Sequence, residues 1–198
     1  MSARSSVLTG DDGRVRCGWV GVDPEYQRYH DEEWGVPLHG DRPLFEKLSL
    51  EAFQSGLSWL TILRRRAAFR SAFCGFDIAR IAAFDETDVE RLVLDASIIR
   101  NRAKIAATIG NARVAKALIE PKPGALDDLM WGHAARKGSR PSTLDDVPTA
   151  TAESTALSVQ LRALGFRFVG PTTIYALMQS TGMVDDHVVG CFRARQPI

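Results

Sequence analysis

The recurrence of helix-capping residues ahead of apolar stripes is the feature that most restricts this fold. Asp23-Pro24 and Asp41-Arg42-Pro43 are typical helix starts, because a short polar side chain accepts backbone N–H groups and proline suits the first turn. No run of residues alternates apolar and polar as a half-buried strand does. The chain is therefore predicted to be all-α, with helices over 24–29, from Asp41, from Ser58, from Asp77, from Thr87 or Asp88, and over 100–119, 124–131, 152–164 and 171–180.

The composition is that of an ordinary globular chain. Of its 198 residues, 45% are hydrophobic and 25% are charged, and no apolar stretch approaches the roughly 20 residues that a spanning helix needs. The N-terminus lacks the apolar core of a secretion signal, so we expect a cytoplasmic protein without membrane association. Three cysteines argue against a disulfide scaffold. The formal net charge of +1 excludes a strongly cationic tail but allows a local basic face.

The length predicts one well-packed domain. Residues 1–15 are rich in Ser, Gly and Asp and lack periodic apolar positions, so we expect them to form a flexible leader. Residues 16–198 then form the single domain. Within it, residues 134–148 are predicted to be a loop, because Gly, Ser and two prolines interrupt any pattern there.

Four possible metal ligands lie near the two ends of the domain. Cys17 precedes His30, and His187 precedes Cys191 by four residues, which puts the second pair on one face if that stretch is helical. Cys₂His₂ is a closed tetrahedral zinc set, so an ion held by all four is structural and joins the two ends of the chain. The spacing also fits buried cysteines beside hydrogen-bonded histidines.

Glycines flank a six-residue turn between the last two predicted helices. Gly165 suits the left-handed position that ends a helix, and Gly170 allows close approach of the backbone before Pro171 opens the next helix. The unpaired N–H groups at that helix start form a natural phosphate site. The turn also fits an ordinary connection in which Phe166 and Phe168 fill the core.

Several aromatic residues fall within the first 59 positions, and one carboxylate in the same region lies on an apolar stripe of a predicted helix. Glu51 follows Leu48 by three residues and Leu44 by seven, which places it on their stripe of the helix. A glutamate there is either at the edge of the stripe in water or buried for a purpose. The second alternative is a polar anchor, flanked by Gln54, in a pocket lined by Trp19, Trp34, Trp59, Tyr26 and Tyr29.

Five motifs together resemble the DNA-3-methyladenine glycosylase I family. They are RCGWV (16–20), YHDEEWGVP (29–37), LEAFQSGLSW (50–59), GFRFVGPT (165–172) and DHVVGC (186–191). The resemblance implies an all-helical glycosylase of the helix-hairpin-helix superfamily, with the hairpin unit at about 152–181. It implies an enzyme that binds double-stranded alkylated DNA and hydrolyses the N-glycosidic bond of 3-methyladenine, and we expect this enzyme to act as a monomer.

The resemblance also assigns roles to particular residues. Structural zinc, one ion per chain, falls on Cys17, His30, His187 and Cys191. Glu51 and Tyr29 recognise the base, while Trp59, Trp19 and Trp34, with Gln54 beside them, shape the pocket. Gly56 and Leu57 form the wedge into the duplex. The phosphate-binding hairpin comprises Gly165, Phe166, Arg167, Gly170 and Thr172.

The chemistry of the lesion explains these residue types. Methylation at N3 gives adenine a positive charge, which aromatic faces attract and a carboxylate pairs with. The same charge weakens the bond to deoxyribose, so little nucleophilic assistance is needed. Many helix-hairpin-helix glycosylases place a catalytic aspartate after the hairpin, whereas this family is described as lacking it. Asp185 lies near that place, and of three roles (water activation, sugar stabilisation, or a cap that orients His187) we favour the cap.

Basic residues are dispersed along the sequence, and we expect some of them to give the hairpin face salt-sensitive DNA binding. They include 64–66, Arg100, Arg102, Lys104, Arg162, Arg167, Arg193 and Arg195. Two other classes of protein remain open. A non-catalytic nucleic-acid-binding module does not need Glu51, Tyr29 and Trp59 together. A zinc-dependent hydrolase needs an open coordination site, which four protein ligands do not leave.

Overall fold

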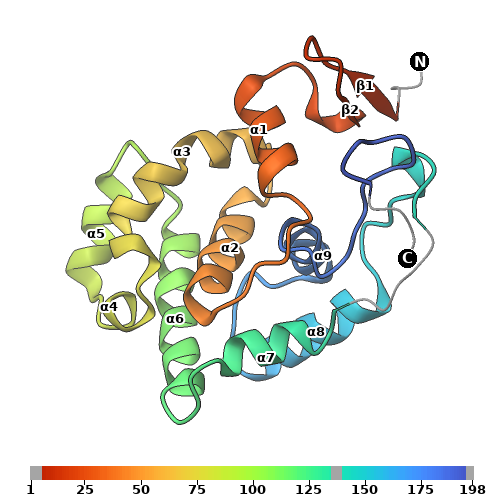
Figure 1. Cartoon of the computed structure of the whole chain (residues 1–198). Coiled ribbons are helices and arrows are strands. Elements are labelled where there is room, and N and C mark those ends of the chain that lie inside the picture. Colours follow the sequence, from red (N-terminus) through yellow and green to blue (C-terminus); the bar gives the residue numbers. More distant parts are fainter. Residues whose placement is uncertain (1–5, 135–139, 195–198) are drawn as a thin grey trace.

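The prediction of a helical fold is confirmed in a computed structural model that describes residues 6–134 and 140–194 (Figure 1). Its helices are α1 (Pro24–Glu32), α2 (Asp41–Gln54), α3 (Trp59–Ala72), α4 (Ile78–Ala82), α5 (Glu86–Leu94), α6 (Arg102–Ile119), α7 (Ala125–Trp131), α8 (Ala152–Ala163) and α9 (Pro171–Ser180). Within the described ranges, no helix combines the length and apolarity needed to cross a membrane.

A short antiparallel hairpin precedes the helices, and the sequence analysis missed it. Strand β1 (Val7–Thr9) pairs with β2 (Val15–Cys17), so that Val7 faces Cys17. The expectation of a flexible leader over residues 1–15 is therefore wrong for β1 and for the start of β2, while residues 1–5 lie outside the described residues. Strands of three residues are too short to show the alternation from which strands are predicted.

Most helix starts are capped as predicted. The Asp23 carboxylate accepts N–H groups of the first turn of α1, the Ser58 hydroxyl caps α3, and the Asp77 carboxylate caps α4. The start predicted at Thr87 or Asp88 lies instead at Asp85, whose side chain accepts both of their N–H groups. These local hydrogen bonds fix where each helix begins.

Asp41 caps a helix other than its own. Its carboxylate accepts N–H groups from Gly124, Leu126 and Asp127 at 2.7–3.1 Å, which are the unpaired donors at the start of α7. Asp41 itself is the first residue of α2, and its N-cap is Gly40, with φ of +98°. The side chain therefore connects two helices that are far apart in the sequence.

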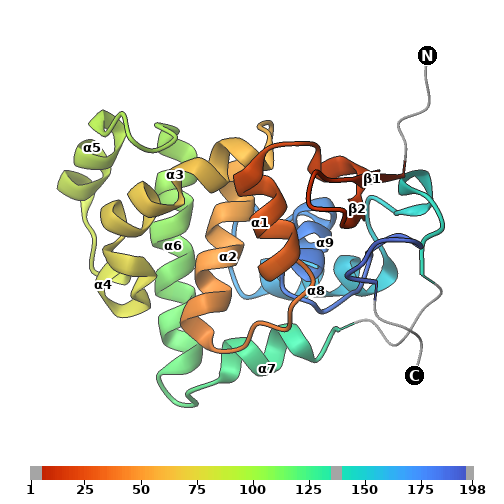
Figure 2. The ribbon, with the colours of Figure 1, turned by 45° about the horizontal axis from the view of Figure 1, so that its top comes forward.

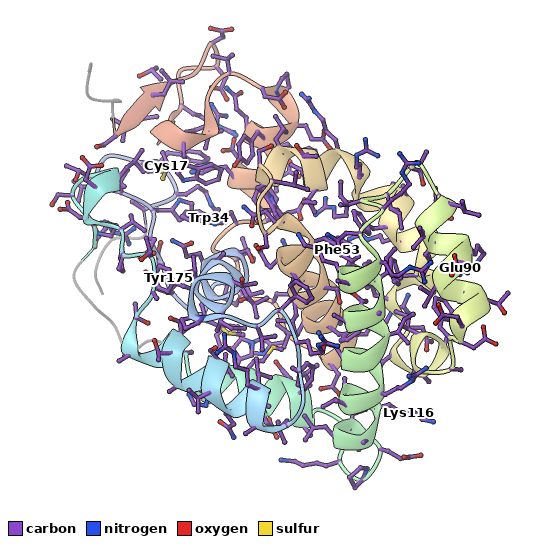
Figure 3. The ribbon with its side chains drawn as sticks, turned by 180° about the vertical axis from the view of Figure 1, so that it is seen from behind. Cys17, Trp34, Phe53, Glu90, Lys116 and Tyr175 are labelled. Atoms are coloured by element: carbon purple, nitrogen blue, oxygen red, sulfur yellow. The ribbon has the colours of Figure 1, made fainter. Side chains whose placement is uncertain are left out.

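Helix α2 occupies the centre of the molecule and contacts α3, α6, α7 and α9 (Figures 1 and 2). Helices α8 and α9 pack against each other, and the chain after α9 returns to β2, where the Phe192 N–H donates to the Val15 carbonyl at 2.7 Å. Figure 3 shows Cys17 and Trp34 on this side of the molecule, and Glu90 and Lys116 on the side formed by α5 and α6. The two ends of the described chain thus lie next to each other.

Candidate active site and metal centre

A cavity of about 360 Å³ opens beside α1, α2 and α9. Its volume lies within the roughly 300–1,000 Å³ of typical ligand pockets. The cavity is lined by all the residues predicted to recognise or surround the base. It is also lined by residues of α9, of the segment before α8 and of the segment after α9. The lining residues are Trp19, Tyr26, Tyr29, Trp34, Glu51, Gln54, Trp59, Leu144, Val147, Ala176, Gln179, Ser180 and Asp186.

Glu51 lies at the inner wall of this cavity and is only 4% exposed. Burial penalises the carboxylate and raises the pKa of Glu51 to about 7, although Lys47 and the Ser180 hydroxyl act in the opposite direction. Of the two alternatives for this stripe position, the structure selects the buried one. A buried carboxylate with a raised pKa at the wall of a cavity is a candidate for binding a cation or an N–H donor.

The aromatic wall is a connected set of rings. The ring centroid of Trp19 lies 5.0 Å from those of both Tyr26 and Trp34, and the rings of Tyr29 and Trp59 are 5.4 Å apart. Burial raises the pKa of Tyr29 well above its usual value and that of Tyr26 to about 12, so both phenols keep their protons at neutral pH. The wall therefore offers π-faces for a planar cation and hydroxyl groups for hydrogen bonds.

Three polar residues of the pocket were not predicted. Asp186 is 8% exposed, and one of its carboxylate oxygens accepts hydrogen bonds from the Tyr175 hydroxyl at 2.6 Å and from the Gln179 amide at 2.8 Å. Ser180, from the last turn of α9, lies near Glu51. Periodicity gave no signal for them, because their proximity to Glu51 depends on the packing of α9 against α2.

Lys47 is a fourth residue that the sequence analysis missed. It is 8% exposed and stands three residues after Leu44 and four before Glu51, hence on the same stripe of α2. This position carried the same signal as Glu51, a charged side chain among apolar positions. Its ammonium group lies 4.8 Å from the ring centroid of Tyr29.

The four predicted metal ligands converge into one buried cluster. The ligand atoms of Cys17, His30, His187 and Cys191 all lie within 4.8 Å of one another. Cys17 Sγ is 3.7 Å from His187 Nδ1, and Cys191 Sγ is 3.4 Å from His30 Nε2. Bonds of about 2.0–2.3 Å to a tetrahedral zinc ion separate its ligands by roughly 3.3–3.8 Å. The cluster therefore fits a metal ion, although the stretch from His187 to Cys191 is a turn and not a helix.

Further contacts hold the ligands in place. His30 Nδ1 is 2.8 Å from the Asp31 carboxylate, and His187 Nε2 is 3.3 Å from the Trp34 carbonyl oxygen. Each imidazole is thus oriented by a contact to the ring nitrogen that faces away from the cluster. The hydrogen bond between the two sulfurs raises the pKa of Cys17 and lowers that of Cys191. A bound cation would favour the thiolate form of both.

The predicted wedge is an exposed corner between α2 and α3. Gly56 has φ of +84°, and Leu57 is 41% exposed. The ammonium of Lys104, from α6, donates to the carbonyls of Phe53 at 2.9 Å and Ser55 at 2.6 Å. Lys104 belongs to the set of basic residues of which some were expected to form a basic face, but it is 7% exposed and supports this corner from inside.

The glycine hairpin between α8 and α9 has the predicted turns. Gly165 has φ of +103°, and Gly170 caps α9 ahead of Pro171. Phe166 is 3% exposed, so its side chain belongs to the core and only its backbone is available for the predicted DNA contact, whereas Phe168 is exposed, with a left-handed φ of +57°. Such strain in a bulky residue is common at functional sites.

Asn111, on α6, fixes the hairpin backbone. Its side chain accepts from the Arg167 N–H at 2.8 Å and donates to the Arg167 carbonyl at 3.0 Å. The side chains of Arg167 and Thr172 belong to exposed residues, as a DNA-contacting role requires. Nothing in the local sequence indicated Asn111, because it lies 56 residues before the hairpin.

Several of the basic residues pair with carboxylates of the protein itself. Arg66 pairs with Glu33, Arg64 pairs with Asp23, and Arg102 bridges Glu86 and Glu90. Arg195 lies outside the described residues. On the hairpin, Arg162 and Arg167 remain exposed.

Asp185 does not line the cavity. Its carboxylate pairs with Arg140 at 3.0 Å and accepts the His187 N–H at 3.2 Å. Arg140 also donates to the His187 carbonyl at 2.9 Å. These contacts support the orienting role over the two catalytic ones.

Comparison with known proteins identifies the family. The family model described as methyladenine glycosylase matches residues 19–194. The chain belongs to this family. The resemblance stated from the five motifs is thereby confirmed over nearly the whole domain.

Curated relatives and solved structures agree with this assignment. The chain is 49% identical over 178 residues to DNA-3-methyladenine glycosylase 1 of Escherichia coli, covering 89% of this chain and 95% of that protein. It is 42% identical to DNA-3-methyladenine glycosylase of Haemophilus influenzae, covering 89% and 96%.

Among solved structures, a crystal structure of 3-methyladenine DNA glycosylase I has a TM-score of 0.87 and 46% identity, covering 90% of this chain and 98% of that one. The 3-methyladenine DNA glycosylase I of Staphylococcus aureus, described in terms of its recognition of 3-methyladenine, has a TM-score of 0.82 and 31% identity, covering 89% and 94%. The similarity therefore extends to the whole fold of this family.

Proposed function

We propose that this protein is a DNA glycosylase that hydrolyses the N-glycosidic bond of 3-methyladenine in alkylated double-stranded DNA. The observation that carries the proposal is the buried Glu51 in a cavity walled by Tyr29, Trp59 and two further tryptophans. The relatives named for this activity cover most of the chain and support the same substrate.

The pocket recognises the lesion by its charge and shape. The extruded base enters the aromatic wall, where the rings attract its positive charge and Glu51 accepts an N–H group. Neutral adenine lacks this charge, so it gains less from the ionised carboxylate. Because the cationic base is already a good leaving group, the main tasks of the enzyme are extrusion and selective binding. Tyr29, which keeps its proton, fixes the orientation of the base by a hydrogen bond.

Two exposed elements position the duplex. Leu57, at the corner held by Lys104, enters the base stack and fills the space left by the extruded nucleotide. The N–H groups at the start of α9 bind backbone phosphates, with Arg167 and Thr172 beside them. Because these contacts neutralise phosphates, DNA affinity falls as salt rises and depends little on sequence.

Zinc is the metal that we propose for the cluster of Cys17, His30, His187 and Cys191. Two sulfur and two nitrogen ligands at these separations match its tetrahedral preference. The ion supplies a cross-link between the two ends of the domain and leaves no open position for substrate. Its effect on the reaction is limited to holding α1 and the chain after α9 in place.

Release of free base from methylated DNA tests the proposal. The protein is incubated with duplex DNA treated with a methylating agent, and free 3-methyladenine is quantified by chromatography. We expect release by the wild type and a loss of at least about 100-fold in Glu51→Gln. Glu46→Gln is the matched control, because Glu46 lies on the same helix but pairs with Arg70 outside the cavity. Binding of the DNA without any release would favour a non-catalytic module and overturn the proposal.

A further inference from the structure

Lys47 is a buried lysine without a conventional partner. Its ammonium nitrogen is shielded from solvent and has no hydrogen-bond partner among the described residues. Buried ammonium groups are normally paired, since an unpaired charge in the interior costs stability. Packing alone would be served better by methionine or leucine at this position, because neither side chain carries a charge. The lysine therefore calls for an explanation other than folding.

The surroundings of Lys47 leave one carboxylate for it to act on. Burial lowers the pKa of Lys47 below its usual value; Glu51, Glu33 and Glu46 act in the opposite direction, and Arg66 acts with burial. Glu33 is already paired with Arg66, and Glu46 with Arg70. Glu51 makes no ion pair within 4 Å in the described part of the chain, and it lies one helical turn after Lys47 on α2.

The aromatic rings fill the space around the ammonium group. Its nitrogen lies 4.8 Å from the ring centroid of Tyr29 and 5.4 Å from that of Trp59, the two rings that wall the pocket beside Glu51. Lys47 itself does not line the cavity. It is thus placed to act on the pocket through its charge while remaining out of contact with a bound base.

We propose that Lys47 is a positioning residue for Glu51, whose buried ammonium, held against Tyr29 and Trp59, opposes the effect of burial and favours the ionised form of that carboxylate in the empty pocket. This inference rests on the proposed function, in which the ionised Glu51 receives the cationic base. The remaining titratable groups around Glu51 are the phenols of Tyr26 and Tyr29 and the carboxylate of Asp186, and none of them supplies a positive charge.

The pKa of Glu51 in the free protein tests the inference without reference to catalysis. It is measured by NMR titration of the side-chain carboxyl carbon in the wild type and in Lys47→Met. We expect the midpoint of Glu51 to rise by about one to two pH units in the variant, because burial then acts without the opposing charge. Lys104→Met is the matched control: it also removes a buried lysine, but one that donates to the carbonyls of Phe53 and Ser55 at the C-terminal end of α2 and is not among the charges that act on Glu51, so it should leave the midpoint unchanged.

The pH profile of excision provides the second readout. In Lys47→Met the acidic limb of the kcat/KM profile should shift to higher pH by as many units as the midpoint of Glu51. The plateau at higher pH should stay within about threefold of the wild-type value. Lys47→Arg should restore the acidic limb of the wild type. Lys47→Gln serves if the methionine variant does not fold. An unchanged Glu51 midpoint, or a loss of activity equal at every pH, would overturn the inference. If the wild type releases no base, the proposed function fails, yet the titration still decides the role of Lys47.

Discussion

Two buried polar clusters lie against α1, and they differ in how their polar atoms are satisfied. In the cluster of Cys17, His30, His187 and Cys191, each ligand atom faces another ligand, and the second nitrogen of each imidazole has its own oxygen neighbour. At the pocket wall and directly behind it, the indole N–H of Trp59 and the ammonium of Lys47 have no hydrogen-bond partner among the described residues.

This difference is the one expected between the proposed structural centre and the proposed binding site. A fully paired polar cluster stabilises one arrangement of the chain, whereas unpaired buried groups cost stability and persist where a ligand or a reaction needs them. Removing a member of the cluster should accordingly lower the free energy of unfolding of the protein. Removing the buried charge of the pocket should raise it. Each prediction below tests one side of this contrast.

Removal of one metal ligand should have the largest effect. Cys191→Ala leaves the other three ligands buried and incomplete, so we expect the free energy of unfolding to fall by about 3–5 kcal/mol, together with loss of the bound metal. Denaturant unfolding and metal analysis measure the two effects. Cys74→Ala, at a cysteine outside the cluster, should change neither. A metal-free Cys191→Ala protein with wild-type stability would remove the structural role of the cluster.

Neutralising Glu51 should instead stabilise the protein at high pH. The folded pKa of Glu51, about 7, lies above its ordinary value of 4.5. The folded state therefore holds the proton more tightly, and the contribution of this group to stability is lost as the pH rises between those values. Glu51→Gln avoids this loss, and we expect its advantage over the wild type to grow to about 2–3 kcal/mol between pH 4.5 and pH 8. Thermal unfolding across that range is the measurement. A constant difference at all pH values would mean that Glu51 is not a buried, titrating group.

The smallest effect is expected at Asp185, which borders the metal cluster. Because its pair with Arg140 is partly exposed, Asp185→Asn should lower the free energy of unfolding by less than about 1 kcal/mol and change base release by less than about threefold. Denaturant unfolding and the chromatographic assay measure these two quantities. A loss of base release comparable to that in Glu51→Gln would assign Asp185 to the chemistry, and it would then belong with the pocket residues and not with the metal cluster.

The sequence predicted what is encoded locally. Capping by Asp23, Ser58 and Asp77, and the glycine turns at 165 and 170, follow from residue types and spacing within a few positions. The buried position of Glu51 was one of two alternatives, since a helical stripe shows a face but not what covers it.

The elements that were missed depend on distant packing. Asp41 interacts with a helix more than 80 residues away, and Asn111 holds a hairpin 56 residues away, so neither had a local signal. The hairpin of β1 and β2 is too short for periodicity. Phe166 was assigned to DNA binding because it lies in the motif of the phosphate-binding turn. Whether its side chain or only its backbone can reach DNA depends on burial, which is set by the whole fold.

Tyr29 and His30 are consecutive residues of α1, one in the wall of the pocket and the other in the Cys/His cluster. A displacement of the imidazole therefore shifts the neighbouring phenol through a single peptide unit. If the cluster holds the proposed ion and the pocket the proposed base, the metal content of a preparation and its affinity for that base should consequently vary together.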